Sequence, residues 1–136
     1  MNKAAFSIEH YRFTKVAIDV SNFNDEELEL DFDPHGVFNY QDSTFELTFN
    51  FKAFAKGEQD NPFVNIQCVG LFKFENLESF DDIPSYFYRN SIAILFPFVR
   101  SFVSIVTIQA NVPPIMLPTM NLSSLEEPLK QNTTQK

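Results

Sequence analysis

Residues 91–117, SIAILFPFVRSFVSIVTIQANVPPIML, constrain the fold more than any other part of the sequence. From residue 92 to residue 108 the only charged side chain is Arg100, and apolar side chains would lie on every side of a helix. A helix that is apolar all round must be covered by a large core, by another subunit or by a membrane. Such a helix would be roughly 25 Å long, which is close to the thickness of a bilayer core.

Polar residues inside this stretch argue against a membrane span. Pro97, Arg100, Ser101, Ser104 and Thr107 interrupt it, and it has no second span and no flanking Lys/Arg cluster. We therefore predict a soluble helix, without stable membrane insertion, that its own chain cannot cover completely.

The charge of the chain is negative and unevenly distributed. The net charge of −8 argues against a nucleic-acid partner, which would require a basic surface. Residues 1–82 contain 16 acids and 6 bases, whereas residues 83–136 contain 2 acids and 4 bases. The 17 phenylalanines indicate exposed aromatic surface or a large buried interface. Because residues 1–6 contain no hydrophobic signal core, we expect a cytoplasmic protein.

Alternating apolar residues predict four β-strands before the long helix. The expected strands cover residues 6–20, 27–33, 44–53 and 63–74. The first has an imperfect period that requires a bulge or a break near Tyr11. Pro34, His35 and Gly36 are typical of a turn, and residues 56–62 of a hairpin loop. Together these segments predict a four-stranded antiparallel meander.

The remaining residues predict helices and a tail. We expect a short helix at residues 83–89, and a long helix capped by Asn90 or Ser91 that becomes regular near Phe96 because Pro97 disfavours a helix interior. Residues 112–114 end it, and residues 121–130 predict a short amphipathic helix. The fold class is therefore α+β, with a single domain over residues 1–130 and a disordered tail at residues 131–136.

Residue patterns for catalysis or metal binding are missing. His10 and His35 lack a nearby nucleophile or a metal-ligand spacing, and Cys68 is the single cysteine. Hot-dog-fold thioesterases also place an apolar helix against an antiparallel sheet, which makes a thioesterase the enzyme alternative. Such enzymes need an acidic or polar catalytic group near the helix, and residues 91–108 supply no acidic one. We predict no catalytic residue, no metal, no cofactor and no enzymatic activity.

Two motifs in the second half of the chain resemble the SecB family. They are ILFPFVRSFVSIVT at residues 94–107 and PPIMLPTMNLSSL at residues 113–125. VGLFKF at residues 69–74 and ELELDFD at residues 27–33 resemble strands of the same family. The resemblance implies a homotetramer, built as a dimer of dimers, whose long helices pack together between the dimers. It also implies an ATP-independent chaperone that holds non-native polypeptides in surface grooves and delivers many of them to SecA for export.

The resemblance assigns three sets of residues. The client-binding groove would contain Leu28, Leu30, Phe32, Ile115, Met116, Leu117 and Met120. Adaptable apolar side chains suit varied extended partners, although each of these residues could equally be ordinary core. The helix packing implies an oligomer interface that contains Phe96, Val99, Phe102, Val103 and Val106.

The partner of the chaperone is open at this point. Export-type SecB proteins carry acidic residues for SecA on the exposed face of the sheet, and this chain has Val16 and Asn65 at the aligned positions. The acidic row Glu27, Glu29, Asp31 and Asp33 is a possible substitute docking face; a solvated sheet face is its simpler interpretation. Some SecB-like proteins instead protect an antitoxin within a toxin–antitoxin–chaperone system. The expected clients are therefore unfolded precursor polypeptides or an antitoxin.

Overall fold

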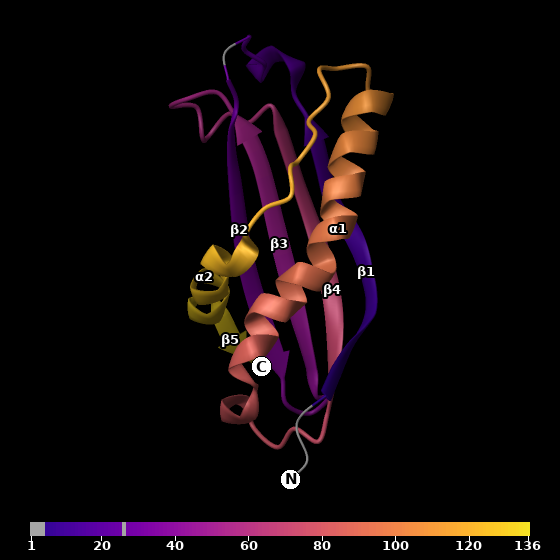
Figure 1. Ribbon diagram of the computed structural model, residues 1–136, viewed down its shortest axis with the longest axis vertical. Helices are drawn as coiled ribbons and strands as arrows, with labels where there is room; N and C mark the ends of the chain where they lie inside the picture. Colours follow the sequence, from indigo (N-terminus) through magenta and orange to yellow (C-terminus); the bar gives the residue numbers. More distant parts are fainter. Residues whose placement is uncertain (1–4, 26) are drawn as a thin grey trace.

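The computed structural model describes residues 5–25 and 27–136, and in it helices cover one face of a β-sheet (Figure 1). The elements are β1 (Ala5–Ile18), β2 (Glu29–Asn39), β3 (Thr44–Phe54), β4 (Val64–Glu75), α1 (Ser85–Gln109), α2 (Glu126–Gln131) and β5 (Thr133–Gln135), with 3-10 turns at Val20–Asn22, Phe80–Asp82 and Leu122–Leu125. The sheet order is β1-β4-β3-β2-β5. The predicted α+β class is confirmed, but the sheet has five strands and is mixed, because β5 runs parallel to β2.

Strands β3 and β4 supply the centre of the core by strict alternation. Their helix-facing side chains are fully or almost fully buried: Phe45, Leu47, Phe49, Phe51 and Ala53 in β3, and Val64, Ile66, Cys68, Phe72 and Phe74 in β4. Because successive side chains of a strand point to opposite faces, the other half of each strand forms the outer face of the sheet. This pattern confirms the predicted orientation of both strands.

Strand β1 pairs with β4 along its whole length and contains two register shifts. These lie between Ile8 and His10 and between Phe13 and Lys15. Each shift adds one residue, so Phe6, Ile8, Tyr11, Phe13 and Val16 all pair with residues whose side chains face the helix, or with Gly70. The irregular period of the sequence therefore reflects bulges, as predicted.

The predicted turn at Pro34, His35 and Gly36 is wrong, because β2 continues through it to Asn39. The Pro34 carbonyl accepts a hydrogen bond from Asn132 Nδ2 at 3.2 Å, on the side of β2 that faces away from β3. The missing N–H of proline points to that same side, so it removes no bond from the β2–β3 ladder. A Cβ added to Gly36 would lie 2.3 Å from Phe45 Cζ, so glycine is needed here for close packing and not for a turn.

Helix α1 is one continuous helix, in place of the two predicted segments. Pro97 lies inside it, on the exposed side together with Ala93. The Ala93 carbonyl, which loses its helical donor to the proline, is therefore open to water, and this lowers the cost of proline at this position. By length and composition α1 could cross a membrane. In this structure it packs along the sheet instead (Figure 1).

The last residues form a strand where a disordered tail was predicted. Thr133–Gln135 pairs with residues 36–38 of β2. The Gly36 amide donates to the Asn132 carbonyl at 3.2 Å, and the Lys136 amide donates to the Phe38 carbonyl at 2.8 Å. Leu129 of α2, which is fully buried, anchors this segment in the core. The strand could not be predicted from the polar composition of the tail, because it is held by backbone hydrogen bonds that do not depend on the side chains.

Candidate peptide-binding groove

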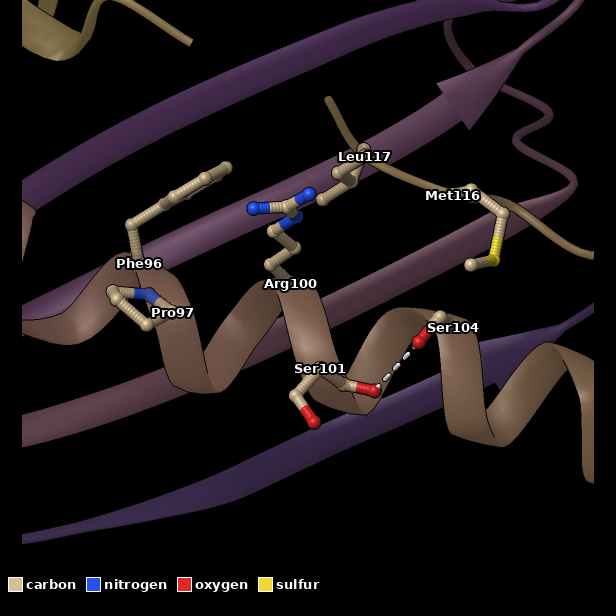
Figure 2. A pocket seen from close by; sticks show the side chains of 7 residues that line it. All are labelled: Phe96, Pro97, Arg100, Ser101, Ser104, Met116 and Leu117. Atoms are coloured by element: carbon tan, nitrogen blue, oxygen red, sulfur yellow. Dashed lines mark hydrogen bonds between the residues drawn. The ribbon is translucent and has the colours of Figure 1, made fainter. Parts of the chain in front are cut away.

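An open pocket of about 300 Å³ lies between α1 and the segment that leaves its C-terminal end (Figure 2). We call residues 110–121 the crossover loop, because they run from the end of α1 across the helical side of the sheet to α2 (Figure 1). We call this pocket the groove. It is lined by Phe96, Pro97, Arg100, Ser101, Ser104, Met116 and Leu117. Helix and loop thus form its two walls.

Thr107 fixes the crossover loop to the helix. Its hydroxyl donates to the Val103 carbonyl at 2.8 Å and accepts from the Ile115 amide at 3.1 Å, and the side chain is fully buried. Asn111 takes a positive φ of 57° after the last helical turn, which turns the chain back along the helix. The position at which the crossover loop leaves α1 is therefore fixed.

Alternation along the crossover loop separates anchors from exposed groups. Ile115 and Leu117 are buried, whereas Met116 between them is 67% exposed. Met120 is partly buried and packs against the core. An extended backbone produces this arrangement, because neighbouring side chains point in opposite directions. Met116 is thus the loop side chain most available to a bound polypeptide.

The groove residues predicted at and just before the start of β2 differ in availability, although Leu30 and Phe32 both lie on the helical side of the sheet. Phe32 packs against Phe51 and Phe96, with ring centroids 5.4 and 6.0 Å apart. Leu28 is partly buried against the core, and Leu30 is 39% exposed. Of the residues predicted for client binding, only Met116 and Leu117 line the groove, and Leu30 and Met116 are the exposed ones.

The sequence prediction missed four of the helix residues that line the groove: Pro97, Arg100, Ser101 and Ser104. Their spacing of three and four residues places them on one side of a helix. The signal was therefore present, but these residues were interpreted only as evidence against a membrane span.

The residues predicted for the oligomer interface lie mainly in the core of the subunit itself. Phe96, Val99 and Val103 are 6% exposed or less, because they face the sheet, while Phe102 and Val106 are partly buried. The exposed apolar side chains of α1 are others, namely Phe98, Ile105 and Ile108. Next to them, Tyr11 stacks on Phe98 at 4.1 Å and Phe13 on Phe102 at 4.0 Å, between ring centroids.

The outer face of the sheet carries charges of both signs. Asp31 is paired in register with Lys52, and Asp33 with Asn50, and these residues border a shallow depression together with Lys15, Asn65 and Gln67. Hydrogen bonds cross this face from Thr14 to Gln67 and from Gln67 to Asn50, both at 2.9 Å. Glu29 shares the face, whereas Glu27 precedes the strand. Asn65 lies on the outer face as aligned, but Val16 lies on the helical side, since it pairs with Ile66.

The surroundings of Cys68 do not activate its thiol for catalysis. Burial raises the pKa of the Cys68 thiol to about 12, so this thiol stays protonated and weakly nucleophilic at neutral pH. His35 contacts Asp33 at 2.8 Å on the outer face. Within residues 5–25 and 27–136, His, Cys, Asp and Glu side chains form no cluster of three that could hold a metal ion.

Comparison with known proteins identifies the family. The model of the family described as preprotein translocase subunit SecB matches residues 6–133. The chain belongs to the SecB family. The protein-export protein SecB of Ehrlichia canis is 27% identical over 106 residues, which are 71% of this chain and 60% of that protein. The uncharacterized protein MJ0357 of Methanocaldococcus jannaschii is 35% identical over 75 residues, which are 52% of this chain and 48% of that protein. The chain thus spans about half of one relative and three fifths of the other.

A solved SecB-like structure has the same fold. It is the Mycobacterium tuberculosis Rv1957 SecB-like chaperone in complex with a ChAD peptide from the Rv1956 HigA1 antitoxin. Its TM-score is 0.67 at 18% identity, covering 85% of this chain and 88% of that one. This similarity confirms the SecB-like arrangement of sheet, long helix and short terminal helix.

Replacing the Thr107 hydroxyl should loosen the start of the crossover loop. In Thr107→Val the buried Ile115 amide loses its acceptor, so we expect the free energy of unfolding to fall by about 1–3 kcal/mol. Thr107→Ser, which keeps the hydroxyl, is the matched control and should lose less. Urea unfolding followed by circular dichroism measures both, and equal losses would contradict the role assigned to the hydroxyl.

Proposed function

We propose that this SecB-family protein is an ATP-independent holdase of the cytoplasm that binds non-native polypeptides in the groove between α1 and the crossover loop. The observation that carries the proposal is an open, mainly apolar pocket whose wall exposes Met116. A methionine side chain adapts to different partner side chains, as a chaperone with many clients requires. Closing the groove over one large apolar client side chain would contribute about 1.5–3 kcal/mol.

Strand β2 offers such clients a second set of contacts. Among the described residues, β5 covers only residues 36–38 on the outer edge of β2, so the backbone edge before Pro34 has no strand beside it. An extended polypeptide can add to a free sheet edge through backbone hydrogen bonds, which are independent of sequence. Leu30, which is exposed near this edge, could then pack against an apolar side chain of the client.

We further propose that α1 and β1 together form the interface of a homotetramer. Tyr11, Val16, Phe98, Ile105 and Ile108 are 38–55% exposed within the subunit. We call these five residues the seam surface, because they border the α1–β1 contact. Exposed apolar groups on two packed elements are typical of an interaction site. The seam surface replaces the buried residues that the sequence had suggested.

Two client classes are supported. The export protein SecB of E. canis is a relative, which favours precursor polypeptides destined for the Sec pathway. The solved SecB-like chaperone holds an antitoxin peptide, which favours a dedicated antitoxin client. The outer sheet face bears on this choice, because Lys15, Lys52 and Asn65 make it less acidic than a docking face for SecA should be. We put export first on the family match and keep the antitoxin as the second candidate.

Charges at the two exposed client contacts, Met116 in the groove and Leu30 near the edge of β2, should strongly weaken client binding. In Met116→Glu and Leu30→Glu, a client would have to cover an unpaired carboxylate, which costs more than the roughly 1.4 kcal/mol that corresponds to a tenfold loss of affinity. Suppression of the aggregation of chemically denatured luciferase measures this loss. Tyr40→Glu, at an exposed position of the β2–β3 turn outside the groove, is the control. Full holdase activity of both variants would contradict the proposed client contacts.

A charge on the seam surface should break the assembly. Light scattering of the unmodified protein should give four times 15.7 kDa, about 63 kDa. Ile105→Asp should lower this mass, because it introduces a charge into an apolar interface. Val20→Asp, at a 59% exposed position outside the seam surface, should leave the mass unchanged. A monomeric unmodified protein would refute the tetramer.

Isolation of the protein from its own cells should distinguish the two client classes. An export chaperone should carry many secretory precursors together with SecA. A dedicated chaperone should carry one small antitoxin. Mass spectrometry of the bound proteins provides the measurement, with Met116→Glu as the control for binding through the groove. Absence of any bound polypeptide would refute both classes.

A further inference from the structure

We propose that β5 is a removable edge strand that limits the length of the extended client segment that β2 can take. This inference rests on the proposed holdase function, in which clients add to the free edge of β2. Strand β5 pairs with residues 36–38, whereas no strand of the described residues lies beside residues 29–33 on this side. The edge of β2 is thus divided into an open part and a covered part.

The hydrogen bonds of β5 show which backbone groups of β2 point to this edge. The Gly36 amide donates to the Asn132 carbonyl at 3.2 Å, on the side of β2 that faces away from β3. Because the hydrogen-bonding direction along a strand alternates with a period of two residues, the amides and carbonyls of Leu30 and Phe32 point to the same edge. The open part therefore offers donors and acceptors to an extended client.

Asn132 marks the boundary between the open and the covered part. Its side chain donates from Nδ2 to the Pro34 carbonyl at 3.2 Å. Pro34 has no amide hydrogen, so this carbonyl is the one backbone group that it can offer to a strand. A client strand that grows along β2 beyond Phe32 therefore meets an occupied acceptor and then β5. Such a client must end there or take the place of β5.

The attachment of β5 to β2 consists mainly of backbone hydrogen bonds. The side chains of Thr134 and Gln135 are exposed, and the buried anchor of this segment is Leu129 of α2, which precedes the strand. A client strand would form with Gly36 and Phe38 the same kind of backbone bonds that β5 forms. Exchange therefore replaces hydrogen bonds and leaves none of them broken. Strand β5 can leave β2 while Leu129 stays in the core.

This edge lies away from the proposed interface of the assembly. The sheet order places β1 at one edge of the sheet and β2 with β5 at the other (Figure 1). The seam surface consists of residues of α1 and β1, and none of its residues belongs to β2 or β5. The proposed tetramer interface therefore does not include the edge at which the exchange takes place.

A disulfide that locks β5 to β2 tests the exchange. Val37 and Thr134 are paired in register on neighbouring strands, at a spacing that a disulfide can bridge, so Val37→Cys combined with Thr134→Cys should form the lock on oxidation. Cys68 is buried and stays out of this reaction. Two fluorescent peptides of alternating leucine and serine serve as probes. One is as long as residues 29–33, and the other is as long as the whole of β2.

Fluorescence anisotropy measures the affinity of both peptides for the oxidised and the reduced protein. The reduced protein should bind the long peptide roughly fivefold more tightly, as expected when a few further backbone hydrogen bonds become possible. The short peptide should bind both forms equally, because it needs only the open part. Asn132→Ala, which frees the Pro34 carbonyl, should strengthen binding of the long peptide. Thr134→Cys alone, treated with the same oxidant, is the matched control and should behave like the unmodified protein.

Hydrogen exchange of residues 132–136, followed by mass spectrometry, detects the displacement itself. Exchange should become faster when the long peptide binds and should not change with the short one. Equal affinity of the oxidised and reduced forms for the long peptide would overturn the role of β5 and leave the holdase function intact. Failure of both forms to bind either peptide would refute the holdase function, and this inference with it.

Discussion

The structure depends on one helix that a single sheet covers on one side only. Val99 and Val103 of α1 are buried against β-strands, while Phe98, Ile105 and Ile108 remain exposed on the same helix. A chain of this length cannot supply a second layer for them. The crossover loop covers one side of α1 incompletely, and the uncovered part is the groove. On the side next to β1, apolar side chains of α1 stay exposed within the subunit. The groove and the seam surface thus have a common origin in the excess apolar surface of α1.

Much of the sheet could be predicted, because burial of one face makes apolar and polar residues alternate in the sequence. Phe45, Leu47, Phe49 and Phe51 alternate with polar residues, so both the strand and its orientation followed from the pattern. The irregularity of β1 near Tyr11 likewise indicated a bulge. The long helix followed from the apolar run at residues 92–108, and the groove wall formed by the crossover loop followed from the family resemblance.

The failures occur where tertiary contacts override local preferences. Pro34 and Gly36 have the composition of a turn, but Asn132 and the ring of Phe45 provide partners that a local pattern cannot reveal. Pro97 favours the start of a helix by its local preference alone. It lies inside α1 instead, on the exposed side, where the Ala93 carbonyl that loses its helical donor is open to water. Phe96, which the family resemblance placed in an oligomer interface, is buried within the subunit, and an all-apolar helix does not show in advance which side the sheet occupies.

The arrangement of charges differs between the two faces of the molecule. The outer face combines Asp31 and Asp33 with Lys15 and Lys52, and such mixed charges favour a hydrated surface over a strongly anionic dock. The helical side has an almost uncharged groove in which Arg100 is the exception. In a groove of this kind apolar contacts can supply affinity for many sequences. The proposed holdase function needs only such an apolar surface on the helical side, because apolar contacts are not directional and depend little on the exact sequence of the client.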